Sequence, residues 1–383
     1  MNEYLETSDS QFGFKKELGC SQGIYTVRYT VDYFTTNNST VNLCTIDICK
    51  CFDKLNNHAL FLKLMCRNVP RNVILILKCW FTKVFVTVKW KSYLSRTVKL
   101  EAGVRQGGCL SPYLFAMFVD GLLVKLKQSR LGCHIAGMCF NAVMYADDLL
   151  ILAISLRDLQ LLVNICTEEF DKLDLTVNIK KSMCIRIGKK HNENIAPVVI
   201  YKQPLAWVQE IRYLGVVIVS SKSFKCNLQV SRQKYFRALN AIFARIGTKA
   251  SPSVILSLVR SYCLPVLLYG IEALSISANL MSTLDNAFGT IFAKIFLTFE
   301  RKIIMNCQFF CGVLPLSYTL DCRIFEFYVR LMHSSNECVK LHFLRTGKKS
   351  FERLQKIYNV PMSASKSQLK YVMWSKFESS LES

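Results

Sequence analysis

Two adjacent carboxylates, Asp147 and Asp148, are the side chains of this chain best suited to do chemistry. They close the tetrapeptide Tyr-Ala-Asp-Asp at positions 145–148, between largely apolar runs at 141–144 and 149–153. Such a pattern predicts a hairpin of buried strands with the acids at its turn. Neighbouring ionised aspartates repel each other and favour a counter-charge. Mg²⁺ would supply it, because it prefers oxygen ligands and leaves positions open for phosphates; a solvated Asp-Asp turn is the structural alternative.

A second carboxylate strengthens the metal hypothesis. Residues 41–48 alternate as a half-buried strand does, and Asp47 lies at the end of that strand. A strand-end aspartate and a hairpin-turn pair suit a two-metal phosphoryl-transfer site, whose ions lie roughly 3.5–4 Å apart. We therefore expect Asp47, Asp147 and Asp148 to converge on one cleft, with Asp53 outside the metal shell.

Five blocks, in this order, resemble the reverse transcriptase of LINE-type (non-LTR) retrotransposons. They are residues 45–55 (first palm motif), 103–112 (template and nucleotide loop), 145–148, 178–182, and 212–215 (primer-grip turn). Residues 11–14, Gln-Phe-Gly-Phe, also resemble the stretch before the palm. One short motif is weak, but five in order are specific. The likeness covers about residues 10–300.

The resemblance implies a role for each matching residue. The metal ligands would be Asp47, Ile48, Asp147 and Asp148, for two Mg²⁺ ions with Mn²⁺ as an alternative. Phe52 would lie under the sugar of the incoming dNTP, Gln106 and Gly107 would contact the nucleotide, and Lys181 would protonate or neutralise the pyrophosphate. Tyr213, Leu214 and Gly215 would form the primer grip. Gly108, Cys49 and Cys51 depart from the family's usual residues, and none of them is a ligand.

Each of these roles has a structural alternative. Phe52 can be a core aromatic, Lys181 a solvated lysine, and Tyr213 a half-buried strand tyrosine. Aromatic residues of 301–383 can stack on nucleic acid or simply pack; they include Phe309, Phe310, Tyr358, Tyr371 and Trp374.

Charge favours a polyanionic partner. The net charge is +22 over 383 residues, and it is uneven. Residues 180–260 hold 15 Lys and Arg against two acids, whereas residues 151–179 carry a net charge of −3. The basic stretch follows the candidate catalytic blocks, where the family has its primer grip and thumb. We expect nucleic-acid contacts there from Lys222, Lys225, Arg232, Lys234 and Arg237; a generally basic surface is the alternative.

Cysteine usage and hydropathy limit the compartment. Seventeen cysteines are scattered without zinc-ligand spacing, which favours free thiols in a reducing compartment. No uncharged apolar run approaches ~20 residues. We expect a protein of the nucleus or cytoplasm that is neither secreted nor membrane-spanning; its oligomeric state does not follow from the sequence.

The predicted fold class is α+β: a right-hand polymerase palm, with helices on one face of an antiparallel sheet, then a helical thumb. Expected domains are 1–40 (remnant of fingers), 41–225 (palm with primer grip), 226–300 (thumb) and 301–383 (role unknown). Helices are expected near 73–81, 111–126 and 156–173, the last two begun by Ser111-Pro112 and Ser155. Residues 83–89 and 96–100 are expected to be strands, and Ser251-Pro252 to start a helix.

The expected function is RNA-directed DNA synthesis on an RNA template from a DNA primer or target, with dNTPs. A viral RNA-dependent RNA polymerase is the rival enzyme, but it would need a ribose-permissive residue instead of Phe52. An inactive retrotransposon remnant that binds nucleic acid is the rival from another class.

Only 46 residues precede Asp47, with Lys15, Lys16 and Arg28 as their cations. We therefore expect a chain truncated in its fingers and a poor or inactive polymerase.

The basic stretch yields a first testable prediction. Neutralising the five expected contact residues should weaken binding to all nucleic-acid sequences. It should also flatten the salt dependence by about one unit of log–log slope per lost phosphate contact. A filter-binding titration measures both, and an unchanged slope would assign these side chains to solvation.

Overall fold

The computed structural model describes residues 4, 6–246 and 250–382 as two compact units. The first unit comprises residues 1–23, 30–214 and 219–224, and the second comprises residues 24–29, 215–218 and 225–383. The domain boundaries expected from the sequence stay predictions.

A five-stranded sheet in the order β13-β10-β1-β9-β8 organises the first unit. Its strands are β1 (Thr40–Ile46), β8 (Ala142–Tyr145), β9 (Asp148–Ala153), β10 (Met183–Gly188) and β13 (Ala206–Trp207). All pairings are antiparallel except that of β10 with β13. Strand β1 is buried along almost its whole length because it pairs on both sides. The predicted strand before Asp47 and the predicted hairpin at 145–148 are therefore confirmed.

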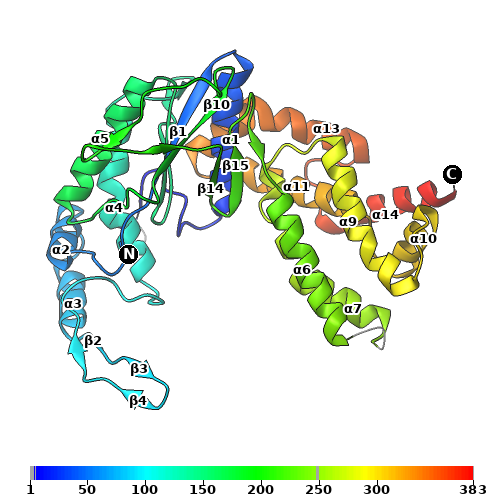
Figure 1. The fold of residues 1–383 in the computed structure, drawn as a ribbon, viewed down its shortest axis with the longest axis horizontal. Helices are drawn as coiled ribbons and strands as arrows, with labels where there is room; N and C mark the ends of the chain where they lie inside the picture. Colours follow the sequence, from blue (N-terminus) through cyan, green and yellow to red (C-terminus); the bar gives the residue numbers. More distant parts are fainter. Residues whose placement is uncertain (1–3, 5, 247–249, 383) are drawn as a thin grey trace. The chain divides into compact units, whose positions relative to one another are not determined.

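Helices α4 (Ser111–Gln128) and α5 (Leu156–Lys172) pack against each other, α4 also contacting β8 and α5 contacting β1 and β9 (Figure 1). Eleven residues of α4 are buried, as expected for a helix that faces the core of an α+β unit. Helix α5 begins at Ser155, whose hydroxyl accepts the Asp158 N–H, as predicted. The remaining helices of this unit are α2 (Asn57–Cys66) and α3 (Arg71–Thr82). The N-terminal helix α1 (Cys20–Thr36) is shared between the two units.

Two local predictions need correction. Helix α4 starts where expected, but its N-cap is Leu110, and the Ser111 hydroxyl instead donates to the Arg105 carbonyl at 2.6 Å. The strands expected at 83–89 and 96–100 form only as two-residue pieces. These are β2 (Phe85–Val86), β3 (Lys89–Trp90), β4 (Tyr93–Leu94) and β5 (Val98–Lys99), and every residue from 85 to 100 is exposed. Without a face to bury, their ladder stays short.

Short strands complete the unit and lead into the next: β6 (His134–Ile135), β7 (Met138–Cys139), β11 (Val199–Ile200), β12 (Gln203–Pro204), β14 (Glu210–Tyr213), β15 (Val216–Val219) and β16 (Lys225–Cys226). Strands β6 and β7 pair with each other, as do β11 and β12.

The second unit is helical after β16. Its helices are α6 (Gln229–Ile246), α7 (Pro252–Leu258), α8 (Leu264–Leu267), α9 (Ala278–Phe296), α10 (Arg301–Phe310), α11 (Leu316–Met332), α12 (Glu337–His342), α13 (Lys348–Tyr358) and α14 (Lys366–Glu382). Helix α7 begins at Ser251-Pro252, as predicted. The five-stranded sheet is mostly antiparallel, is backed by helices and is followed in the chain by a helical region. This arrangement confirms the predicted α+β fold class.

The C-terminal aromatics divide between packing and exposure. Phe309 contacts the rings of Trp374 and Phe377, and the buried Tyr358 donates its hydroxyl to Asp321. Phe310 and Tyr371 are 84% and 75% exposed. Within the described residues, no helix is both long and apolar enough to cross a membrane. All seventeen cysteines are free thiols.

Candidate active site

Strand pairing brings the three candidate carboxylates to one end of the sheet. Ile46, the last residue of β1, pairs with Leu149, so Asp47 follows directly beside Asp148. Tyr145 pairs with Asp148 across the β8–β9 hairpin, which leaves Ala146 and Asp147 as the two turn residues. Residues a hundred positions apart in the chain thus share one sheet edge.

Burial and neighbouring charges perturb the carboxylate of Asp148. Burial raises the pKa of Asp148, the neighbouring Asp147 and Asp47 carboxylates raise it further, and Arg212 opposes them. Asp53 is exposed and accepts a hydrogen bond from the Gln106 amide at 3.2 Å. A carboxylate cluster of this kind attracts cations.

The carboxylates are not gathered into a finished metal site. Within the described ranges, no three His, Cys, Asp or Glu side chains lie close enough together to hold a metal ion. Ile48 is buried and bridges to Val177, so only its main-chain carbonyl could serve as a ligand. The donor atoms have the oxygen chemistry that Mg²⁺ prefers, and binding would require them to draw closer.

Sequence reasoning missed Cys51 as a partner of the site. Its thiol donates to a carboxylate oxygen of Asp147 at 3.5 Å. Burial raises the pKa of Cys51, and the charge of Asp147 raises it further, so the thiol stays protonated and can donate. Its signal in the sequence was the departure from the family pattern beside Lys50.

Residues 178–182 hold the main chain of Asp47 from both sides. The Asn178 N–H donates to the Asp47 carbonyl at 2.8 Å, and the Asp47 N–H donates to the Ser182 hydroxyl at 3.1 Å. Lys181 lies in this turn with an exposed side chain. The block therefore fixes Asp47 and leaves the lysine amine in solvent.

The expected nucleotide loop is anchored beside Phe52. The Val104 N–H donates to the Phe52 carbonyl at 2.8 Å. At Gly103, which has φ +89°, a Cβ would lie 2.6 Å from the Asp53 carbonyl, so the close approach requires glycine. Gln106 and Gly107 are exposed beyond this anchor. The Phe52 ring stacks on Phe115 with centroids 4.5 Å apart, so its packing role is present in the structure.

The three expected primer-grip residues differ in their contacts and in their backbone conformation. Tyr213 is buried, and its hydroxyl donates to the Val143 carbonyl at 2.9 Å, which ties β14 to β8. That hydroxyl is therefore used inside the fold. Leu214 and Gly215 both have left-handed φ values, +45° and +83°. Of the expected backbone-contact residues, Arg232 is half-buried, and the exposed ones are Lys222, Lys225, Lys234 and Arg237.

An N-terminal strap, residues 6–15, supports the carboxylate turn. Gln11 is fully buried, and its side-chain carbonyl accepts the N–H of Gly13 at 2.9 Å and that of Ala146 at 3.2 Å. Main-chain bonds between Phe12 and Met144, and between Met144 and Ser10, lay the strap along β8. A Cβ at Gly13 would lie 2.6 Å from the Ala146 nitrogen. The strap thus sets the position of the turn that bears Asp147.

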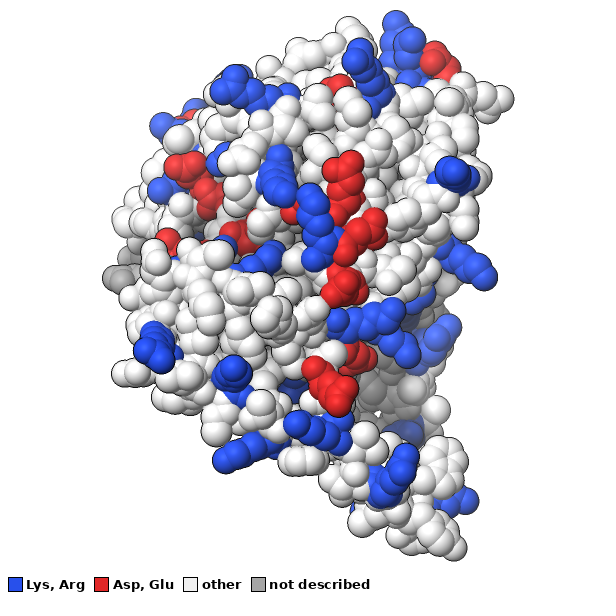
Figure 2. Space-filling model, turned by 90° about the vertical axis from the view of Figure 1, so that its left-hand side faces the viewer, with Lys and Arg blue, Asp and Glu red and all other residues white. Residues whose placement is uncertain are grey.

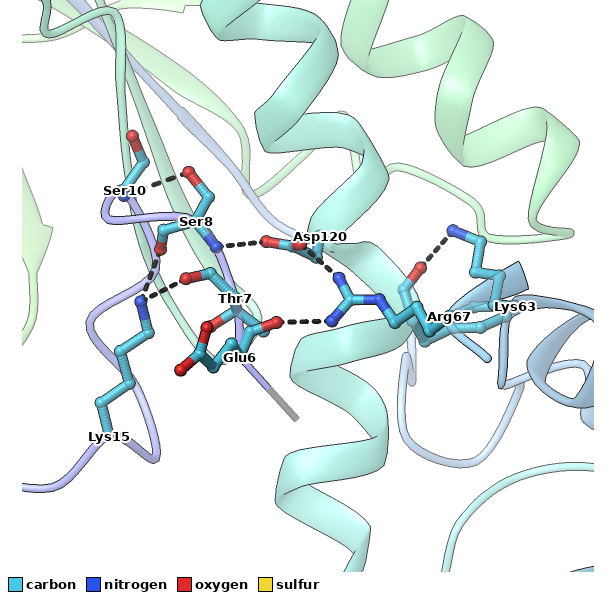
Figure 3. Close-up of polar contacts among 9 residues, drawn as sticks. Glu6, Thr7, Ser8, Ser10, Lys15, Lys63, Arg67 and Asp120 are labelled. Atoms are coloured by element: carbon cyan, nitrogen blue, oxygen red, sulfur yellow. Dashed lines mark hydrogen bonds and ion pairs between the residues drawn. The ribbon is translucent and has the colours of Figure 1, made fainter. Parts of the chain in front are cut away.

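The far end of the strap is held by a buried carboxylate (Figure 3). Asp120 in α4 accepts the Ser8 N–H at 2.7 Å and a guanidinium N–H of Arg67 at 2.5 Å. Arg67 also donates to the Glu6 carbonyl, and Lys15 donates to the carbonyls of Thr7 and Ser8. Asp120 is the only acid of α4 and lies among its apolar residues, which was the sequence signal for this contact.

Comparison with known proteins identifies the family of the chain. Residues 1–218 match the family described as reverse transcriptase (RNA-dependent DNA polymerase). The chain therefore belongs to the reverse transcriptase family, and the LINE-type resemblance stated from the sequence is confirmed.

Three relatives are Pol or polymerase proteins of R2 and jockey elements. The chain is 23% identical over 237 residues to the Pol polyprotein of R2DM of Drosophila melanogaster, covering 59% of the chain and 22% of the relative. It is 22% identical over 301 residues to an R2 Pol polyprotein of Popillia japonica, covering 74% and 48%. It is 25% identical over 279 residues to the RNA-directed DNA polymerase from jockey of Drosophila funebris, covering 70% and 30%.

The chain thus spans about a fifth to a half of the length of these relatives. Among solved structures, apo telomerase from Candida tropicalis aligns over 90% of the chain and 57% of its own length at 14% identity, with a TM-score of 0.47. That likeness is too loose to bear on function.

The raised pKa of Asp148 gives a stability prediction. At pH values above its folded pKa, the ionised Asp148 carboxylate lowers the free energy of unfolding. Below the ordinary aspartate pKa of about 4 the group is protonated in both states, and this loss of stability is absent. Asp148→Asn should therefore raise Tm at pH 7 in EDTA by about 1–2 °C, because solvent screens a partly exposed charge. The gain should vanish near pH 3 (roughly a unit below that pKa). Thermal melts of the variant and of a matched Asp53→Asn control measure it; a lower Tm at pH 7 would contradict it.

A further prediction concerns Gln11. Gln11→Met keeps the approximate size of the side chain but removes its carbonyl acceptor. This loss should lower the free energy of unfolding by about 1–3 kcal/mol and speed amide hydrogen exchange at residues 145–148. Gln160→Met is the matched control, because the Gln160 carbonyl accepts the Val199 N–H at 2.8 Å away from the turn. If exchange at the turn is the same in both variants, Gln11 does not position it.

Proposed function

We propose that this chain catalyses RNA-directed DNA synthesis, in which a primer 3′-hydroxyl attacks the α-phosphate of a dNTP and pyrophosphate leaves. One observation carries the proposal. In a chain of the reverse transcriptase family, the pairing of β1 with β9 sets Asp47 beside the Asp147–Asp148 turn. A structural Asp-Asp turn would not need a third carboxylate brought in from another strand.

The residues proposed to hold two divalent cations, Mg²⁺ or Mn²⁺, are Asp47, Ile48, Asp147 and Asp148. When bound, such ions lower the pKa of the primer hydroxyl and neutralise charge on the reacting phosphate. The oxygen donors support this assignment, as does the raised pKa of Asp148, which comes first from burial and then from the neighbouring Asp147 and Asp47 carboxylates. The Cys51 thiol would keep one oxygen of Asp147 oriented and leave the other for a cation.

Other side chains would position the substrates. Phe52, supported by Phe115, would exclude a 2′-hydroxyl by steric collision and so favour dNTPs. Gln106 and Gly107 would contact the nucleotide, and the exposed amine of Lys181 would neutralise or protonate the pyrophosphate. At the turn after β14, Leu214 and Gly215 would bear on the primer, with Tyr213 as their buried anchor.

The proposed partners are an RNA template, a DNA primer or target, and dNTPs. The excess of positive charge in residues 180–260 supports backbone contacts by Lys222, Lys225, Arg232, Lys234 and Arg237. These contacts would be sequence-independent, because they go to phosphates.

Primer extension with the 383-residue chain tests the proposal. In line with the poor activity expected from the sequence, we expect slow Mg²⁺-dependent incorporation of dNTPs on an RNA template. Asp147→Asn should reduce it at least about 100-fold, because that carboxylate would help to hold the cations that stabilise the transition state. Asp53→Asn, a matched exposed aspartate, should change the rate little.

The same assay separates the rivals. Incorporation of NTPs in place of dNTPs would identify an RNA-dependent RNA polymerase. Template binding with no incorporation above the Asp147→Asn background would identify a nucleic-acid-binding remnant.

A further inference from the structure

The segment 83–100, named here the basic hairpin, extends from the end of α3 away from the sheet of the first unit (Figure 1). It has two short ladders, with Phe85 paired to Lys99 and Trp90 paired to Tyr93. Every residue from 85 to 100 is exposed. A two-stranded ribbon without a packed face is only marginally stable in water. The rest of the protein therefore adds little to the stability of this segment.

The tip of the basic hairpin presents two aromatic side chains. Trp90 is 73% and Tyr93 76% exposed, and as a cross-strand pair they project from the same face. Lys91 takes a left-handed φ of +55° in the turn between them. Exposed aromatics at one tip are unusual for a surface with no binding role.

The charge of the basic hairpin has one sign. Lys83, Lys89, Lys91, Arg96 and Lys99 are its charged side chains, and it contains no acid. Across the described residues, no acidic side chain forms an ion pair with any of the five. In Figure 2 the lowest projection, where the hairpin lies, carries Lys and Arg atoms and no Asp or Glu atoms. The ligand that matches it is a polyanion with planar groups.

The base of the basic hairpin leads straight into the candidate site. Only Glu101 and Ala102 separate Leu100 from Gly103, whose N–H donates to the Leu55 carbonyl at 2.8 Å. The next residue, Val104, is bonded to Phe52. A strand held along the hairpin would therefore be directed towards the loop at 103–107.

We propose that the basic hairpin binds single-stranded nucleic acid, with Trp90 and Tyr93 stacking on unpaired bases and the five cations contacting phosphates. The proposal deepens the proposed function, because the bound strand would be the template ahead of the site. Unpaired bases suit it best, since aromatic rings can stack on them without breaking a duplex.

Fluorescence anisotropy of a labelled oligouridylate with the full chain tests this. We expect the double variant Trp90→Ala/Tyr93→Ala to bind about 10–100-fold more weakly with an unchanged salt slope. Lys89→Gln/Lys91→Gln should lower the slope by about 0.7 unit per lost contact. Quenching of tryptophan fluorescence on binding should be smaller in Trp90→Phe.

Matched controls lie at the start of α10, where Phe299 is 92% exposed and Lys302 is also exposed. Phe299→Ala and Lys302→Gln should bind as the unaltered chain does, and melting curves should show every variant folded. Equal affinity of the hairpin variants and the controls for the oligouridylate would overturn the proposal. It would also be overturned if the hairpin variants lost binding to anionic lipid vesicles but bound the oligouridylate normally.

The outcome is independent of catalysis, because no dNTP is present. Failure of primer extension with hairpin-dependent binding would refute the proposed polymerase activity and leave the hairpin assignment standing.

Discussion

The double pairing of β1 is the constraint on which the first unit depends. Strand β1 bonds β9 on one side and β10 on the other, so neither edge is free. Almost all of its residues are also buried, on both faces of the sheet. Its register admits no one-residue slip, since a slip would turn Leu43 and its neighbours to the opposite face. Whatever follows Ile46 must therefore emerge at the β8–β9 turn, and the chain places Asp47 there.

Placing three carboxylates at one sheet edge costs stability, and the surrounding contacts indicate how that cost is accommodated. Asp47 is held by main-chain and hydroxyl groups of residues 178–182, and Asp147 by a protonated thiol. Gln11 accepts a main-chain N–H of the turn itself. None of these contacts neutralises the charge. The site is thus fixed in position yet left electrostatically unsatisfied, which suits a cation-dependent reaction.

Support within the first unit is uneven. The carboxylate turn is fastened by the strap, by Tyr213 and by the sheet, whereas the segment 83–100 has only its own short ladders. Reacting atoms must align, so a rigidly placed carboxylate turn favours catalysis. The exposed segment 83–100, held only by its short ladders, can adapt to a nucleic-acid strand of varying sequence. The two regions are joined through the loop anchored at Phe52.

The sequence by itself determined what local chemistry can specify. Apolar runs around Asp147 and Asp148 predicted their hairpin, a serine cap predicted the start of α5, and five ordered blocks indicated the family. Tertiary structure alone decided which distant groups meet. Cys51 reaching Asp147, the Gln11 amide under Ala146, and Asp120 holding Ser8 involve separations of 96, 135 and 112 residues. No periodicity encodes such contacts, because they depend on strand register and on how α4 packs against the sheet. The same reason explains the errors. Ser111 donates its hydroxyl to the Arg105 carbonyl instead of accepting an N–H at the helix start, and the ladders of 83–100 stayed short because nothing covers them.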